Sequence, residues 1–171
     1  SDYETEEHVE RTREMAARLG HAMNLSDSDI GKLELLAVLH DIGKVAIPHH
    51  VLVKKGKLND EEFKIMQQHT VKGYRIAKSS PELGDIADCI LSHHEKWDGT
   101  GYPNRLKGEE IPLLARIISA VDSHDVMVHN RPYHQAMPEE DAIAELRRCA
   151  GTQFDPNIVE IFTNLLEKEE L

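Results

Sequence analysis

The residues with the clearest potential for chemistry are histidines and aspartates at the ends of apolar segments. His40-Asp41 ends one apolar helical pattern, and His93-His94 ends another. Adjacent residues on a helix point about 100° apart, so one helix end can present an imidazole to one metal ion and a carboxylate to two. A carboxylate bridges through its two oxygens, whereas a neutral imidazole binds one metal. We therefore expect a metal centre to which both segments contribute.

Further candidate ligands lie on other helical segments. His8 lies in the first segment with Glu4 one turn earlier, and His69 lies in the third. Asp122 lies inside an apolar helix, where a carboxylate is costly unless it is paired or coordinated. Each has an ordinary alternative: a solvated or buried histidine, a surface Glu–His pair, or a buried hydrogen-bond acceptor. Together they would let five helices bring ligands to one end of a bundle, as in di-metal carboxylate proteins.

The donor atoms of this set are nitrogen and oxygen, without sulfur. Such a set disfavours a closed structural zinc site and favours iron, manganese or related octahedral metals. Seven side chains suit two metals that keep open positions, and Glu4 would help to hold a third. The seven are His8, His40, Asp41, His69, His93, His94 and Asp122.

Length and composition restrict the class of protein. The 171 residues suffice for one domain with a full core, and the 40% apolar content predicts that it folds alone. A net charge of −11 argues against a nucleic-acid polymer as partner but allows a small anionic substrate, because bound cations invert local charge. We find no apolar run of membrane-span length and no signal peptide. We interpret Cys89 and Cys149 as buried free thiols, which favours a cytoplasmic location.

The periodicity of apolar residues is helical nearly throughout, which predicts an all-α fold. We expect a compact bundle of about seven helices in a single domain, 1–171, excised from a longer signalling protein. Asn59 and Glu62 resemble a capping box, and Asp155-Pro156 is a suitable cap for the last helix. The expected helices are 2–23, 29–42, 59–78, 81–92, 112–128, 138–149 and 156–168.

These motifs resemble those of the HD-GYP family, a branch of the HD phosphohydrolases. Residues 40–44, HDIGK, and residues 93–103, HHEKWDGTGYP, resemble its two signatures. The runs 106–112 and 151–156, LKGEEIP and GTQFDP, continue the likeness, which covers essentially the whole chain. The resemblance implies an HD-domain helical bundle with a bi- or trinuclear metal site, commonly iron. It implies cleavage of cyclic dinucleotides, chiefly cyclic di-GMP, to linear pGpG or GMP by a metal-activated hydroxide in bacterial second-messenger signalling.

The resemblance also implies roles for particular residues. The family's ligand positions fall on the seven side chains above, with Asp41 as a bridge and Glu4 as an added ligand in trinuclear members. Lys44 is expected to neutralise a phosphate oxygen; the alternative is a lysine that interacts with a helix dipole. Arg131 is expected to clamp phosphate, unless it is an ordinary surface arginine. We expect Gly101-Tyr102-Pro103 to shape the substrate pocket, although a purely structural loop is equally consistent with the sequence.

The chain departs from the family pattern after the metal aspartate. Asn130 replaces an acid, and His134 stands where a basic residue often contacts phosphate, so we include His134 among the substrate contacts. These departures leave two alternatives open: hydrolysis of a mixed cyclic GMP–AMP or linear dinucleotide, or a catalytically weak binding and interaction module. By family analogy we expect an N-terminal receiver or sensory domain, with GGDEF-type or homodimeric partners. We interpret His124 and His129 as residues that do not bind metal.

Overall fold

The structure, a computed structural model, describes residues 5–131 and 134–169, and in these ranges it has helices and no strand. This confirms the expected all-α class. The α-helices are α1 Glu6–Ala22, α2 Asp27–Leu39, α3 His49–Leu52, α4 Asp60–Gln67, α5 His69–Lys78, α6 Ala87–Ser92, α7 Leu113–Val128, α8 Glu139–Arg148 and α9 Pro156–Glu169. Short 3-10 helices occur at η1 Ile42–Ala46, η2 Gly84–Ile86 and η3 Gly108–Glu110.

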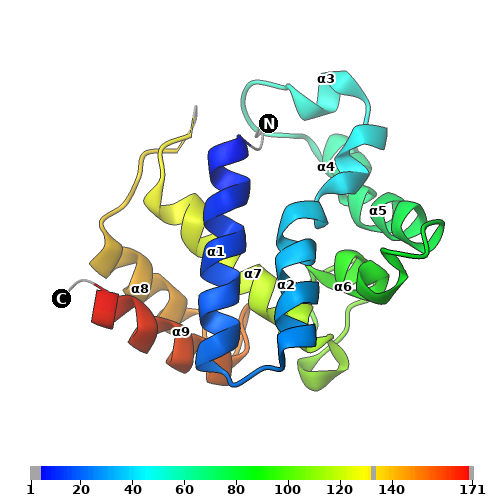
Figure 1. The fold of residues 1–171 in the computed structure, drawn as a ribbon. Helices are drawn as coiled ribbons and strands as arrows, with labels where there is room; N and C mark the ends of the chain where they lie inside the picture. Colours follow the sequence, from blue (N-terminus) through cyan, green and yellow to red (C-terminus); the bar gives the residue numbers. More distant parts are fainter. Residues whose placement is uncertain (1–4, 132–133, 170–171) are drawn as a thin grey trace.

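Helices α1 and α2 form an antiparallel hairpin. The N-terminal end of α1 therefore lies beside the C-terminal end of α2 (Figure 1). Side-chain caps fix where both helices begin, because Thr5 accepts a hydrogen bond from the His8 backbone and Ser26 accepts one from the Asp29 backbone. The hairpin thus brings the first turn of α1, with His8, to the end of α2, with His40.

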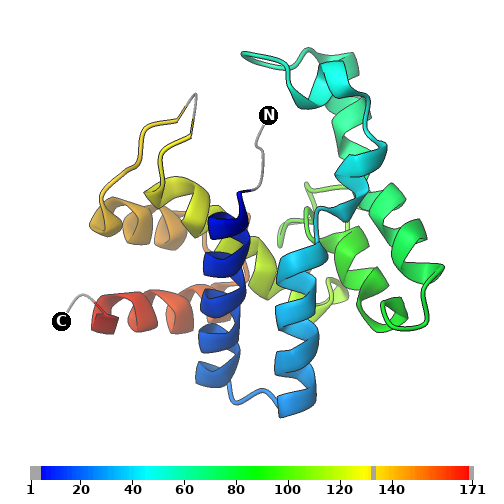
Figure 2. The same ribbon diagram turned by 45° about the horizontal axis from the view of Figure 1, so that its top comes forward.

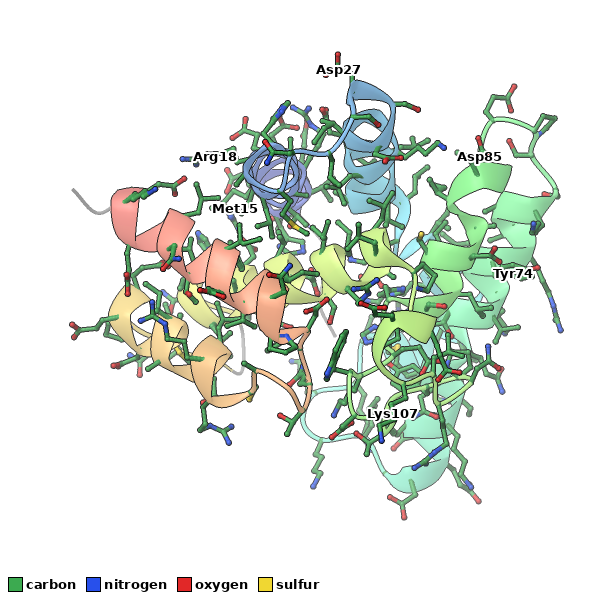
Figure 3. The ribbon with its side chains drawn as sticks, turned by 90° about the horizontal axis from the view of Figure 1, so that it is seen from below. Met15, Arg18, Asp27, Tyr74, Asp85 and Lys107 are labelled. Atoms are coloured by element: carbon green, nitrogen blue, oxygen red, sulfur yellow. The ribbon has the colours of Figure 1, made fainter. Side chains whose placement is uncertain are left out.

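Helix α7 is the central element of the core. Its residues Ile117, Ile118 and Val121 are buried, as the apolar segment predicts. The helix crosses behind the α1–α2 hairpin, with α8 and α9 on one side and α5 and α6 on the other (Figures 1 and 2). Seen from below, Met15 and Arg18 lie on the side of α1 that faces α9, where Arg18 pairs with Glu169 (Figure 3). The core therefore supports every helix that carries a candidate ligand.

Three local features differ from the expectation, and the first is that the expected helix 81–92 divides into η2 and the short α6. The segment 59–78 was expected to be one helix, but it divides at Gln68, whose backbone N–H donates to the carbonyl of Ile65 in a tighter turn. The segment 44–58, expected to be irregular, includes η1 and the single turn α3 after Pro48. These features add helices to the expected seven. The capping box of Asn59 and Glu62 forms as predicted. Within the described ranges, we find no helix with the length and apolar content needed to cross a bilayer.

Candidate metal centre

The candidate ligands meet where several helices begin or end. His40 and Asp41 follow α2, His69 begins α5, and His93-His94 follow α6. Donor atoms of Asp41, His69, His93 and His94 all lie within 4.8 Å of one another. This convergence of residues from three separate helix ends would be costly without a bound cation or a shared hydrogen-bond network.

The carboxylate of Asp41 lies at the centre of this group. Its Oδ1 is 3.2 Å from Nε2 of His69 and 3.2 Å from Nε2 of His93, whereas its Oδ2 is 3.2 Å from Nε2 of His40. The ammonium of Lys44 lies 3.3 Å from the same Oδ2. Oδ1 of Asp41 therefore faces the imidazoles of His69 and His93, and Oδ2 faces that of His40. A carboxylate that bridges two metals needs one oxygen directed to each.

The second set of donors surrounds Asp122 on α7. Oδ1 of Asp122 lies 3.3 Å from Nε2 of His8 and 3.7 Å from Nε2 of His40. The donors thus form two halves that share Asp41. We call Asp41 Oδ1, His69, His93 and His94 the α5–α6 half, and Asp41 Oδ2, His8, His40 and Asp122 the α1–α7 half.

Backbone carbonyls fix the orientation of three histidines. Nδ1 of His40, His69 and His93 lies 2.9, 2.6 and 2.6 Å from the carbonyl oxygen three residues earlier. A carbonyl only accepts, so each Nδ1 carries a proton and each Nε2 is the nitrogen that faces the centre. This is the tautomer that a metal-ligating histidine requires, and the donor set therefore fits divalent transition metals.

His8 is oriented by a different contact. Its Nδ1 hydrogen-bonds to the carboxylate of Asp125, a buried residue one turn after Asp122. Arg11 donates from Nε and Nη2 to both oxygens of Asp125, at 2.8 and 3.1 Å. Sequence reasoning missed Asp125 and Arg11. The signal was their spacing, because each lies three residues after a candidate ligand on the same helix face.

The pKa values of the histidines shift in opposite directions in the two halves: the pKa of His8 is raised, whereas those of His93 and His94 are lowered. Burial disfavours the charged form of His8, but Asp122 and Asp125 outweigh it and raise the pKa of His8 to about 9. Burial likewise opposes ionisation of Asp125, yet His8 and Arg11 lower its pKa to about 2. In the α5–α6 half, burial lowers the pKa of both His93 and His94, which keeps these imidazoles neutral.

Two aspartates of the centre stay ionised despite burial. Burial alone would raise their pKa values, but His40 holds the pKa of Asp41 well below its usual range, and His40 and His8 lower the pKa of Asp122. Anionic oxygens and neutral imidazoles are the donors that divalent metals prefer.

Two glycines allow the close packing on which the α5–α6 half depends. A Cβ added to Gly43 would lie 1.8 Å from the backbone oxygen of His69. A Cβ on Gly101 would lie 2.5 Å from the backbone oxygen of His94 and 2.4 Å from the backbone nitrogen of Lys96. Gly43 thus lets Asp41 approach His69, and Gly101 lets the following loop fold against His94.

The loop 95–108 is held by its own carboxylates. The buried Glu95 accepts hydrogen bonds from the backbone of Asn104 and Leu106, at 2.7 and 3.0 Å. Asp98 accepts from the backbone and hydroxyl of Thr100. These contacts show that both carboxylates cap the loop.

Tyr102 of the same loop lies directly over the centre. Its ring stacks on His94 with the centroids 5.0 Å apart and the planes inclined by 12°, and Phe63 of α4 contacts its other side edge-on. Pro103 follows Tyr102, and both are half-buried. Tyr102 is therefore beside the donors, whereas Gly101 is buried against backbone.

Of the expected phosphate contacts, Arg131 lies beside His8 of the α1–α7 half, whereas His134 contacts the C-terminal end of α7. Nη2 of Arg131 is 3.4 Å from Nδ1 of His8. The backbones of Arg131 and His134 pair at 2.8 and 3.1 Å, and Nε2 of His134 lies 3.3 Å from the carbonyl of Met127. Glu4, Pro132 and Tyr133 lie outside the described residues.

Two further histidines, His124 and His129, contact carboxylates that are not candidate ligands. Nε2 of His124 lies 2.6 Å from Glu139, and Nδ1 of His129 lies 3.3 Å from Asp125. His49 and His50 are exposed on α3.

Comparison with known proteins gives concordant matches. The family model described as the HD domain matches residues 3–158. A cyclic di-GMP phosphodiesterase of Thermotoga maritima is 44% identical over 170 residues, which cover 98% of this chain and 46% of that protein. The 3'3'-cGAMP-specific phosphodiesterase 2 of Vibrio cholerae is 40% identical over 160 residues, 92% of this chain and 31% of that protein. The chain thus spans less than half the length of these relatives.

A solved structure shows the same fold. The crystal structure of a cyclic GMP-AMP specific phosphodiesterase of V. cholerae superposes with a TM-score of 0.74 at 24% sequence identity. The match covers 98% of this chain and 45% of that one.

Proposed function

Because this chain belongs to the HD-domain family, in its HD-GYP branch, we propose that it is a metal-dependent phosphodiesterase that opens cyclic dinucleotides. The observation that carries the proposal is the division of the donors into two halves that share the carboxylate of Asp41. Two cations held side by side suit a phosphodiester, whose hydrolysis needs both an activated water and charge stabilisation.

We assign one divalent metal to each half. Asp41, His69, His93 and His94 would hold one, and Asp41, His8, His40 and Asp122 the other, with Glu4 available to a third. We favour iron, with manganese as the alternative, because the donors are imidazole and carboxylate. When bound, the metals supply an activated water and stabilise charge on the phosphoryl oxygens.

Residues of the chain supply the remaining requirements. Lys44, beside Asp41, is placed to neutralise a phosphoryl oxygen, and Arg131 is placed to hold a second phosphate. Tyr102 would orient the sugar or base above His94, with Gly101 and Pro103 shaping its loop. His134 would reach the substrate after leaving the carbonyl of Met127. In the reaction, water forms a new bond to phosphorus, one phosphorus–oxygen ester bond breaks, and the proton passes to the departing sugar oxygen.

The substrate we favour is cyclic di-GMP, with linear pGpG or GMP as product. A mixed cyclic GMP–AMP is the second candidate, because a relative of 40% identity is named for that substrate. We further propose a cytoplasmic setting and a receiver or sensory domain outside this segment, with GGDEF-type or homodimeric partners. The proposal of a further domain is supported by the length of the relatives, which are more than twice as long as the matched region.

The experiment is a product analysis of metal-loaded protein under reducing conditions. We expect cyclic di-GMP to yield linear pGpG or GMP on chromatography, and Asp41→Asn to lower kcat at least 100-fold. Asp98→Asn is the matched control and should keep activity, because this half-buried carboxylate accepts hydrogen bonds from Thr100 of its own loop. Binding of the dinucleotide without any product from the metal-replete protein would instead favour an interaction module.

A further inference from the structure

We infer that a guanine base of the substrate binds in a cavity between α7 and α8, where Gln153 and Glu145 read its edge. The inference rests on the proposed function, because it names the part of the same site that selects the base.

Two cavities adjoin at the metal centre. The smaller, of about 160 Å³, is lined by the candidate ligands His93 and His94. The larger, of about 370 Å³, runs from α7 to α8 and falls in the range of small-molecule sites. Asp122, Ser123 and Gln153 line both cavities. A molecule whose phosphate lies at the candidate ligands can therefore extend directly into the larger cavity.

The walls of the larger cavity suit an aromatic ring. Val126 and Met127 of α7 line it together with Met137 and Phe154. Thioether and aromatic groups make favourable contacts with the faces of planar rings, and they need no hydrogen bond from the base. A flat purine is thus a better occupant than a sugar or a phosphate, whose oxygens would lose hydrogen bonds to water there.

Gln153 lies where the two cavities join, and its backbone is fixed. Its N–H donates to the carbonyl of Cys149 at 3.1 Å, and its carbonyl accepts from the N–H of Trp97 at 3.1 Å. Its half-buried side-chain amide makes no hydrogen bond with any residue in 5–131 or 134–169. An amide has two N–H donors and an acceptor oxygen, so Gln153 brings uncommitted hydrogen-bonding groups to the cavity.

Glu145 supplies the acceptor that selects guanine. Its carboxylate is held by Arg148, whose Nε and Nη2 donate at 2.8 and 2.5 Å. The thiol of Cys149 also donates weakly to Oε1, at 3.5 Å. Oε2 therefore keeps a lone pair for a ligand, and Oε1 gains one when an N–H donor displaces the thiol. Guanine presents two adjacent N–H donors and a carbonyl oxygen on its Watson–Crick edge. Glu145 can accept from the donors while the amide of Gln153 donates to the carbonyl.

Adenine does not match this arrangement. Its ring nitrogen on the same edge is an acceptor and would face the acceptor oxygens of Glu145. No hydrogen bond can form between two acceptors, so the ring nitrogen would stay unsatisfied. The cavity therefore favours a dinucleotide with at least one guanine over one with two adenines.

The test compares substrates with and without a base. Metal-loaded protein is assayed with cyclic di-GMP, cyclic di-AMP and bis(p-nitrophenyl) phosphate. For Gln153→Ala we expect kcat/KM for cyclic di-GMP, relative to that for bis(p-nitrophenyl) phosphate, to fall about tenfold, mainly through KM. For Glu145→Gln we expect the preference for cyclic di-GMP over cyclic di-AMP to fall about tenfold, because the amide can accept from guanine and can also donate to the ring nitrogen of adenine.

Asn157→Ala is the matched control, since it removes an exposed amide four residues from Gln153. It should leave both ratios unchanged. If the wild type hydrolyses cyclic di-GMP and bis(p-nitrophenyl) phosphate but Gln153→Ala and Glu145→Gln keep the wild-type ratios, the guanine subsite is wrong and the proposed function stands. If the wild type cleaves neither compound, the proposed function itself fails. Thermal unfolding of each variant separates loss of binding from loss of fold.

Discussion

The two halves of the metal centre are built in different ways from similar residues. In the α5–α6 half, His69 and His93 are oriented by backbone carbonyls three residues away in the chain. In the α1–α7 half, His8 is oriented by Asp125, which is 117 residues away and is itself held by Arg11. His69 and His93 of the first half are therefore set by local backbone geometry. In the second half His40 is held in the same local way, but His8 depends on long-range charged contacts.

This difference has an energetic consequence. A carbonyl three residues away is in place as soon as its helix forms, so it adds little conformational entropy cost. The contact between His8 and Asp125 forms only after α1 and α7 have packed, and it depends on the charge of both groups. We therefore expect the α5–α6 half to tolerate changes of charge, and the α1–α7 half to respond to them.

Gly43→Ala should have the largest effect, because it disrupts the packing of Gly43 against His69 in the α5–α6 half. The new Cβ would meet the backbone oxygen of His69 at 1.8 Å, and backbone cannot rotate away. We expect a loss of about 3 kcal/mol in the free energy of unfolding and loss of metal from this half. Urea denaturation and metal analysis measure the two effects.

Gly31→Ala is the control for this change. Gly31 also lies at a helical position, in α2, but nothing lies within 4 Å of an added Cβ. Alanine should stabilise the helix there by about 0.5–1 kcal/mol. Equal destabilisation by both substitutions would show that the contact with His69 is not what Gly43 permits.

Asp125→Asn should separate the halves. The amide retains the shape of Asp125 but removes the charge that orients His8, a change that typically weakens metal binding 10–100-fold. We expect the α1–α7 half to lose its metal first while the α5–α6 half keeps its own, so the stoichiometry should fall by one. Calorimetric titration with Mn²⁺ measures this, and equal weakening of both binding events would contradict the division into halves.

In metal-stripped protein, the histidines of the two halves should change the free energy of unfolding in opposite directions as the pH rises. The pKa of His8 is raised to about 9, so its contribution to stability is complete below about 6.5 and is lost as the pH rises toward 9. The pKa values of His93 and His94 are lowered by burial, so their contribution is present above about 6.5 and is lost as the pH falls. Urea midpoints between pH 5 and 9 should pass through a maximum.

Asp125→Asn provides the sharper version of the pH experiment. Without the charge of Asp125, the pKa of His8 should fall, and the alkaline side of the profile should flatten while the acidic side is unchanged. A profile that changes equally on both sides would mean that the halves titrate as one unit.

The contrast between local and long-range contacts also explains which features of the site can be predicted from the sequence. The positions of His40, Asp41, His93 and His94 at the ends of apolar helices were visible as patterns, and so was the cap at Asn59. Long-range contacts leave a weaker signal: spacing places Asp125 and Arg11 on the helix faces of candidate ligands but does not show that they meet. The partners of Asp125 and the approach of Gly43 to His69 depend on how helices pack, which periodicity does not specify. The division at Gln68 was hidden because one turn of tighter helix keeps nearly the same apolar spacing.

Asn59→Ala should have the smallest effect, and it tests whether the α5–α6 half is local. Asn59 caps α4 and forms a reciprocal pair with Glu62, ten residues before His69. Its loss should cost about 1 kcal/mol in the free energy of unfolding, whereas Asn59→Asp should keep the cap and the stability. Metal affinity should be unchanged in both, because Nδ1 of His69 is held by Met66, close to the far end of α4. If Asn59→Ala also weakened metal binding, the orientation of His69 would depend on the whole of α4, and the distinction between a local and a long-range half would fail.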